Sequence, residues 1–231
     1  MKRILVCEDE EAIRDFVVIN LERAGYDVVD VASGEEAMEV YRRQEGYFDV
    51  ALLDIMMPGI DGFELCKWIR EQSSEIGIIM LSAKSQEMDK VNCLMIGADD
   101  YVTKPFSPSE LVARIDAIYR RVHVKQTPRE EAKELVSGPF KLDYQSRTIS
   151  KNGEFIELTQ VEYHIMEYLM KNNNTALDRK SILRHIWGDA YVGDDKVVDV
   201  NIRRLRMKIE EDPSNPKYIQ TIWGFGYKWN I

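Results

Sequence analysis

Several polar side chains suited to phosphoryl chemistry stand at the ends of short apolar runs in the first half of the sequence. Two carboxylates follow the first run, and later runs end in a carboxylate, a hydroxyl and an ammonium: Glu8, Asp9, Asp54, Ser82 and Lys104. Three clustered carboxylates raise each other's pKa unless a cation lies among them, and an open site with oxygen ligands suits Mg²⁺. A carboxylate, a hard metal ion, an ammonium and a hydroxyl can together stabilise the charge of a transferring phosphoryl group. We therefore predict that Asp54 is a nucleophile that becomes an aspartyl phosphate.

These side chains converge if the apolar runs form one parallel sheet. The runs occupy residues 3–7, 27–32, 49–54, 77–82 and 100–104, and stretches with helical periodicity separate them. Strands that alternate with helices of this length predict a parallel sheet covered on both faces. Open sheets of this kind place their sites at the carboxyl ends of the strands, where all of these side chains are predicted to lie.

Length and composition limit the class of protein. With 231 residues and 45% hydrophobic content, the chain is long enough for two globular domains. It has no apolar run of about eighteen residues, and its start turns acidic before a signal-peptide core could form. We therefore expect a cytoplasmic protein without a membrane segment. Cys7, Cys66 and Cys93 are scattered in apolar surroundings, which favours buried thiols over disulfides or a zinc site.

Charge is distributed unevenly along the chain. Residues 1–121 carry 14 Lys and Arg against 24 Asp and Glu, whereas residues 138–231 carry 14 against 13. Within the second part, residues 196–208 hold five basic side chains and the single acid Asp199. This asymmetry indicates an acidic module joined to one that binds a polyanion.

The motifs of the first module resemble those of a known family. EDE, LLDIMMPGIDG, MLSAK and GADDYVTKPF occur in the order and spacing of the receiver domain of two-component response regulators, and the resemblance covers residues 1–121. It implies a flavodoxin-like (βα)5 fold and phosphorylation of Asp54 by a sensor histidine kinase. It also implies that Mg²⁺ is bound by Asp9, Asp54 and the backbone carbonyl of Met56, with Glu8 acting through water.

The same resemblance implies how the phosphoryl group acts on the rest of the domain. Lys104 and Ser82 would contact it, and Ser82 and Tyr101 would form a switch in which the hydroxyl moves toward the phosphoryl oxygen and the ring swings inward. The chain would then catalyse only its own phosphorylation and the slow hydrolysis of the product. A Mg²⁺-dependent phosphohydrolase, the first rival reading, would need a second acid two residues after the nucleophile, where Met56 stands.

Charged residues near the end of this module suggest an interface. Their signs alternate across a predicted helix, strand and helix: Lys90, Asp99, Asp100, Glu110, Arg114 and Arg121. In the OmpR/PhoB subfamily such charges pair across a two-fold dimer axis, which implies the pairs Lys90 with Glu110, Asp100 with Arg114, and Asp99 with Arg121. A solvated helical surface would show the same pattern, because single surface ion pairs contribute little.

After Arg121 the periodicity disappears, and residues 122–137 are predicted to be a linker. Residues 138–231 then show short apolar alternations typical of antiparallel strands, followed by a helix capped by Thr159 with Glu162 three residues later. Further helices are predicted from about 178 to 188 and from about 196 to 210, with a terminal hairpin around 224–226. A small sheet, three helices and a terminal hairpin are typical of an α+β winged-helix domain.

The third helix of this domain has a side with the chemistry to bind nucleic acid. Its apolar positions should face the core, leaving a more exposed aspect to Asn201, Arg203, Arg204 and Lys208. Arg can form two hydrogen bonds to guanine, and Lys and Arg neutralise phosphates. A basic helix surface that is merely solvated is the alternative.

Residues 138–231 resemble the OmpR/PhoB effector domain through LTQVEYHIMEYL, IWG, VVDVNIRRLRMKI and TIWGFGYKW. By position, the resemblance implies Arg204 as the leading base contact. It implies phosphate contacts from Arg179, Trp187, Lys196, Asn201, Arg203, Arg206, Thr221 and Tyr227. Trp223 stands at the wing position where many members carry an Arg, so the salt dependence or A·T preference of the wing should differ.

Together these features predict a transcriptional regulator that is switched by phosphorylation of Asp54. Its partners would be a sensor histidine kinase, a second copy of the chain, promoter DNA with tandem half-sites about one helical turn apart, and RNA polymerase. A second rival is a protein-interaction switch whose winged domain docks on another protein, and loss of DNA binding without the Arg203 and Arg204 charges would argue against it.

Overall fold

The computed structural model describes residues 2–44, 47–83, 87–123, 133–189, 191 and 194–231, with the backbone alone at 87–89 and 121–123. The chain divides into two compact units, residues 1–122 and 123–231. Among the described helices, none has the length and apolarity needed to cross a lipid bilayer.

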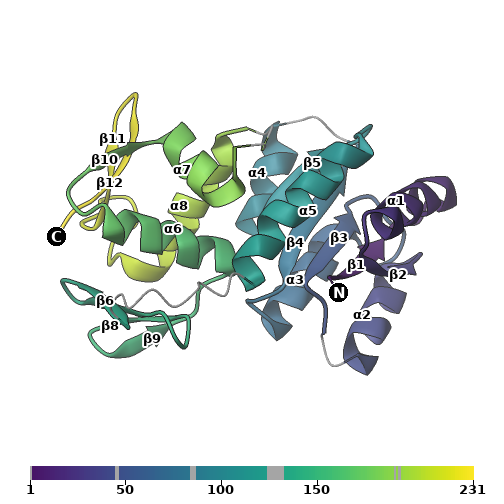
Figure 1. Cartoon of the computed structure of the whole chain (residues 1–231), viewed down its shortest axis with the longest axis horizontal. Helices are drawn as coiled ribbons and strands as arrows, with labels where there is room; N and C mark the ends of the chain where they lie inside the picture. The colour runs from purple at the N-terminus through teal and green to yellow at the C-terminus, as the bar shows by residue number, and fades with distance from the viewer. Residues whose placement is uncertain (1, 45–46, 84–86, 124–132, 190, 192–193) are drawn as a thin grey trace. The chain divides into compact units, whose positions relative to one another are not determined.

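The first unit is the predicted five-stranded parallel sheet with helices between its strands (Figure 1). Its strands lie in the order β2-β1-β3-β4-β5, which is the order of a flavodoxin-like fold. The elements are β1 (Arg3–Cys7), α1 (Glu11–Arg23), β2 (Asp27–Val31), α2 (Gly34–Arg43), β3 (Val50–Asp54), α3 (Gly62–Gln72), β4 (Gly77–Ser82), α4 (Glu87–Met95), β5 (Asp100–Thr103) and α5 (Pro108–His123). The predicted strands and helices are therefore all present.

Burial on both sides explains why these strands read as continuous apolar runs. Every residue of β3 and β4 is buried. Alternate residues of β1, such as Ile4 and Val6, pack with Leu21 of α1 and Ile115 of α5, so these two helices cover one face of the sheet. Since a parallel sheet is covered on both faces, it needs few polar side chains until its strands end. The polar residues at those ends are thus placed by the fold.

The second unit begins with an antiparallel sheet in the order β6-β7-β8-β9. Its strands are β6 (Glu134–Ser137), β7 (Phe140–Asp143), β8 (Thr148–Lys151) and β9 (Glu154–Ile156). The structure places β6 inside the range 122–137 predicted as linker, because Leu135 and Ser137 pair in register with Leu142 and Phe140 of β7. Within the predicted linker, residues 124–132 lie outside the described residues.

Three helices and a hairpin complete the winged-helix domain. They are α6 (Gln160–Lys171), α7 (Arg179–Trp187), α8 (Lys196–Ile209), β11 (Ile219–Ile222) and β12 (Gly226–Trp229). Thr159 and Glu162 form the predicted capping box of α6. A short strand that the sequence did not predict, β10 (Ala176–Asp178), pairs with β12 and gives the sheet order β10-β12-β11.

Candidate functional site

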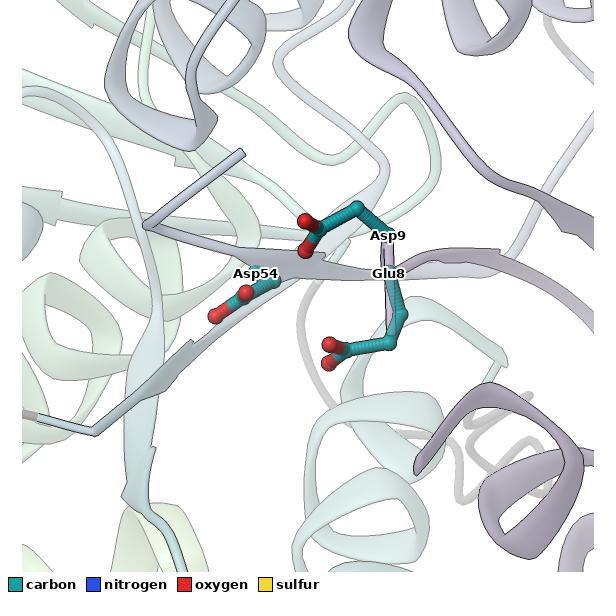
Figure 2. A group of neighbouring side chains, drawn as sticks. All are labelled: Glu8, Asp9 and Asp54. Atoms are coloured by element: carbon teal, nitrogen blue, oxygen red, sulfur yellow. The ribbon is translucent and has the colours of Figure 1, made fainter. Parts of the chain in front are cut away.

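Three carboxylates meet at the carboxyl ends of β1 and β3, as the sequence predicted. Glu8 and Asp9 directly follow β1, Asp54 is the last residue of β3, and these two strands are neighbours in the sheet. One carboxylate oxygen from each residue lies within 4.8 Å of the others. Figure 2 shows the three side chains at this edge of the sheet. Glu8 and Asp54 are buried and Asp9 is half-buried, so Asp9 lies at the open side of the cluster.

Lys104 forms ion pairs with two carboxylates of this cluster. Its Nζ lies 2.7 Å from Oε2 of Glu8 and 3.1 Å from Oδ1 of Asp54. Burial by itself lowers the pKa of Lys104, but the hydrogen bond to Glu8 and the charges of Asp54 and Glu8 outweigh it and raise the pKa. The ammonium is therefore fixed in its charged form between the two buried carboxylates.

One ammonium does not balance three carboxylates. Burial raises the pKa of Glu8, and the charge of Asp54 raises it further against the opposing effect of Lys104. Among the described residues, Oε1 of Glu8 has no hydrogen-bond partner. Burial, with the charges of Asp54 and Glu8, also raises the pKa of the Cys7 thiol to about 12. An excess of negative charge with an unpaired buried oxygen fits a divalent cation with oxygen ligands.

Two residues that the sequence analysis missed shape this pocket. Arg14 of α1 donates from Nη1 to the backbone oxygens of Glu8 (2.8 Å) and Asp9 (3.3 Å), which holds the loop after β1. A Cβ at Gly62 would lie 2.1 Å from the backbone oxygen of Asp54, so only glycine fits where α3 begins. Gly62 ends the motif LLDIMMPGIDG, so the sequence carried a signal for its role. Nothing in the sequence pattern marked Arg14.

The remaining predicted pocket residues lie at the end of β4, on β5 and in the loop after β3. Ser82 ends β4 and is 4% exposed, and its backbone oxygen accepts a hydrogen bond from the Lys104 amide at 2.7 Å. Tyr101 on β5 is 7% exposed, and Nζ of Lys90 lies 5.0 Å from its ring centroid. The Met56 side chain, in the loop after β3, is 56% exposed.

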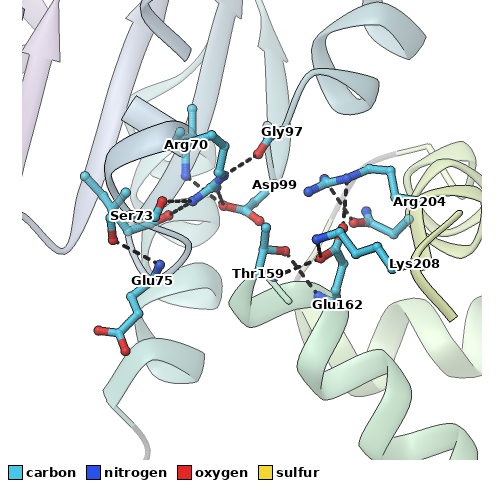
Figure 3. A network of polar contacts seen from close by, with 12 residues as sticks. Arg70, Ser73, Glu75, Gly97, Asp99, Thr159, Glu162, Arg204 and Lys208 are labelled. Carbon is cyan, nitrogen blue, oxygen red and sulfur yellow. Dashed lines mark hydrogen bonds and ion pairs between the residues drawn. The ribbon is translucent and has the colours of Figure 1, made fainter. Parts of the chain in front are cut away.

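Four of the charges predicted to pair across a dimer form ion pairs within the chain: Asp99, Asp100, Glu110 and Arg114. Arg114 contacts Asp100 and Glu110, each at 2.9 Å. Asp99 is 2% exposed and lies 2.6 Å from Arg70, which also donates to the backbone oxygen of Gly97 (Figure 3). The Asp99 carboxylate, just before β5, is thus held inside its own chain by Arg70 and by the backbone amide of Ile78. The Arg121 side chain lies outside the described residues, and the pairs between two chains stay predictions.

In the second unit, the exposed side of α8 differs from the prediction. Arg203 is exposed, whereas Asn201 is fully buried and Arg204 is only 7% exposed, so the predicted exposure of these two is wrong. Arg204 lies 2.9 Å from Oε1 of the buried Glu162 of α6, and Nζ of Lys208 lies 2.7 Å from its Oε2 (Figure 3). A buried carboxylate must be paired, and α8 supplies both cations.

Four of the predicted phosphate contacts form one cluster near the turn of the terminal hairpin, where Thr221 pairs with Tyr227. Asp199 accepts hydrogen bonds at 2.7 Å from Arg179 and from the hydroxyl of Tyr227. Arg206 donates to Thr221 at 2.8 Å. The guanidinium carbons of Arg179 and Arg206 lie 5.1 and 5.6 Å from the Tyr227 ring centroid. Asp199, which the sequence marked only as the lone acid among the basic residues of 196–208, therefore orients Arg179 and Tyr227.

The other predicted contacts are divided between core and surface. Trp187 is 1% exposed and packs into the core at the end of α7, and its contact with a phosphate stays a prediction. Lys196 begins α8 and is half-buried. Trp223 is 91% exposed between β11 and β12.

Comparisons with known proteins agree with both units. Residues 4–116 match the response regulator receiver domain family, and residues 153–229 match the family of the C-terminal domain of transcriptional regulatory proteins. Over 228 residues, 99% of either chain, the sequence is 42% identical to the sensory transduction protein RegX3 of Mycolicibacterium smegmatis. It is 41% identical over the same length to RegX3 of Mycobacterium tuberculosis.

Solved structures give the same result. DrrB of Thermotoga maritima, described as an OmpR/PhoB homolog, is 33% identical with a TM-score of 0.52 and 100% coverage of both chains. A mutant of RitR is 26% identical with a TM-score of 0.76 and 99% coverage of both chains. The chain therefore belongs to the OmpR/PhoB family of two-component response regulators, with a receiver domain followed by a winged-helix DNA-binding domain.

Proposed function

We propose that Asp54 is the residue of this response regulator that accepts the phosphoryl group from a sensor histidine kinase. The meeting of Glu8, Asp9 and Asp54 with Lys104 at one edge of the sheet is the observation that carries the proposal. An oxygen of Asp54 forms a bond to phosphorus while the bond from phosphorus to the donor nitrogen breaks, and the freed imidazole takes up a proton. Lys104 meets the negative charge that the Asp54 side chain gains.

The acidic cluster would hold Mg²⁺ through Asp9, Asp54 and the backbone carbonyl of Met56, with Glu8 acting through water. When bound, the ion would neutralise part of the carboxylate charge and attract the oxygens of the phosphoryl donor. Ser82 then donates a hydrogen bond to a phosphoryl oxygen, and the Tyr101 ring swings inward. The chain catalyses only its own phosphorylation and the slow loss of the phosphoryl group.

Phosphorylation is proposed to favour a dimer of receiver domains that uses the charged residues of α4, β5 and α5. The dimer would bring two winged helices onto tandem half-sites of promoter DNA in the cytoplasm, where RNA polymerase is the further partner. Base contact is assigned to Arg203, since it is exposed on α8 while Arg204 is engaged by the buried Glu162. Arg179, Arg206, Thr221 and Tyr227 supply the phosphate contacts.

The test measures DNA affinity at one fixed salt concentration, with and without acetyl phosphate or BeF₃⁻ plus Mg²⁺. Wild type is compared with Asp54→Asn, which keeps the size of the side chain, and with Asp15→Asn, which removes an exposed acid of α1. Tighter binding and dimer formation on activation, lost in Asp54→Asn and kept in Asp15→Asn, are expected. Equal binding in every condition would refute switching through Asp54, and absence of DNA binding would refute the DNA-binding role.

A further inference from the structure

The turn between β11 and β12 carries the most exposed of the large apolar side chains that the structure describes. The amide of Phe225 donates to the backbone oxygen of Ile222 at 3.0 Å, and Gly224 has a φ of +72°. A positive φ at the third position is what a type II turn requires, which puts Trp223 at the second position. Trp223 is 91% exposed and Phe225 is 46% exposed. The hairpin extends from its domain (Figure 1), so its end presents two aromatic side chains to solvent.

The hairpin holds the backbone of this turn in a fixed position relative to α8. Thr221 pairs with Tyr227 across the strands, and Ile219 pairs with the fully buried Trp229. From α8, Arg206 donates to the backbone oxygen of Ile219 at 2.6 Å and to the Thr221 hydroxyl. The stem is thus anchored to the helix that carries the exposed Arg203. A rigid aromatic side chain loses little conformational entropy when it is bound.

The surroundings of the turn favour duplex DNA as its binding partner. One residue pair before the turn, the guanidiniums of Arg179 and Arg206 lie over the Tyr227 ring, forming the positively charged cluster already described. Because the turn directly follows this cluster along the hairpin, an extended polyanion bound by the cluster would also reach the turn. Residues 222–226 contain no cation, so the turn itself cannot neutralise a phosphate or rely on the negative potential of a narrow groove.

We propose that Trp223 acts as an apolar wedge in the DNA minor groove, where it packs against sugar edges and partly unstacks one base step. This inference rests on the proposed binding of promoter DNA. Apolar side chains in the minor groove bend the duplex by opening a step, and pyrimidine–purine steps open most easily. The wedge contributes affinity without releasing counterions from the DNA. It also favours a flexible base step, and this preference does not depend on hydrogen bonds to the base edges.

Salt dependence separates this role from an electrostatic one. Removal of a phosphate-neutralising cation changes the slope of log K against log salt by about 0.9, whereas removal of an aromatic wedge shifts the whole line and leaves its slope unchanged. Since stacking of one base on an aromatic side chain contributes enough for such a shift, Trp223→Ala is expected to lower affinity on the order of tenfold at every salt concentration. Trp223→Phe should retain most of the affinity, and Trp223→Arg should steepen the slope by about one.

The experiment uses the full chain, activated with BeF₃⁻ and Mg²⁺, and a duplex that the wild-type protein selects from a random-sequence pool. Phe155→Ala is the matched control, since Phe155 is an aromatic residue of β9 that is 65% exposed. In a second measurement, 2-aminopurine replaces in turn each adenine that the hairpin protects from cleavage. Its fluorescence should rise on binding of wild type at one position, and not on binding of Trp223→Ala.

A parallel loss of affinity in Trp223→Ala, with unchanged binding by Phe155→Ala, would support the wedge. Equal affinity of Trp223→Ala and wild type, or a changed slope in Trp223→Ala, would overturn it. If the wild-type protein selected no duplex from the pool, the DNA-binding proposal itself would fail. The two failures are therefore distinguishable.

Discussion

Replacement of Glu162 by alanine should destabilise the DNA-binding domain more than removal of any exposed acid. Oε2 of Glu162 accepts hydrogen bonds from the backbone amide of Thr159 at 2.8 Å and from Nζ of Lys208 at 2.7 Å. Its Oε1 lies 2.9 Å from Nε of Arg204. The alanine variant would leave the guanidinium of Arg204, itself only 7% exposed, buried without its counter-charge. Lys208 can turn to solvent, because about a third of its side chain is already exposed (34%).

The expected cost follows from this asymmetry. Removal of one partner of a buried ion pair typically costs about 3–5 kcal/mol, because the remaining charge stays desolvated. With a urea dependence of about 2 kcal/mol per molar, the midpoint of unfolding should fall by roughly 2 M. A double variant, Glu162→Leu with Arg204→Met, removes both buried charges. It should be less destabilised than Glu162→Ala alone, since a well-packed apolar pair can replace a buried ion pair at little cost.

The pH dependence provides an independent check. Burial by itself raises the pKa of Glu162, but the charges of Arg204 and Lys208 and the hydrogen bonds to the carboxylate lower it below its usual 4.5. A lowered pKa in the folded state contributes stability that is fully present above the unfolded pKa and is lost as the pH falls through the folded pKa. The stability difference between wild type and Glu162→Gln should therefore be constant above pH 4.5 and shrink below it.

Tryptophan fluorescence can follow this transition in the full chain. Of the 4 tryptophans, only Trp68 lies in the receiver unit. Glu134→Ala is the control, because Glu134 pairs with Lys141 at the surface, with side chains 43% and 49% exposed. Its unfolding midpoint should equal that of wild type. A cost below about 1 kcal/mol for Glu162→Ala, as for an exposed pair, would refute the reasoning from burial.

Two further predictions concern the two sites. Lys104→Ala should slow phosphorylation of Asp54 by acetyl phosphate roughly a hundredfold or more, measured by intact-protein mass spectrometry, because it removes a fixed charge that stabilises the transition state; an unchanged rate would contradict this. Arg203→Ala should weaken DNA binding with an unchanged unfolding midpoint, whereas Arg204→Ala should lower the midpoint. Titration and urea unfolding of both variants measure this, and the reverse outcome would return base contact to Arg204.

The sequence by itself determined the elements of the receiver and the location of its pocket. Apolar runs that end in Glu8, Asp54 and Ser82 alternate with helices, and this order leaves a parallel sheet as the arrangement that buries them. The carboxyl ends of parallel strands share one edge, so the polar groups converge whatever the details of packing. Their clustering was therefore predictable.

Pairing across long separations was decided only by the tertiary structure. The strand β10, three residues long, exists because it pairs with β12, and its sequence carries no signal of its own. Asp99 is held by Arg70, and the loop of Glu8 by Arg14, through contacts that no periodicity encodes.

The exposed side of α8 shows the same limit most clearly. Helical spacing identified its apolar core positions, and Val197, Ile202 and Leu205 are indeed buried. Spacing could not show that Arg204 also faces inward, since an arginine is buried only where another element presents a counter-charge. Glu162 presents that charge from α6, so which arginine of this helix is accessible to DNA depends on a carboxylate 42 positions earlier in the chain.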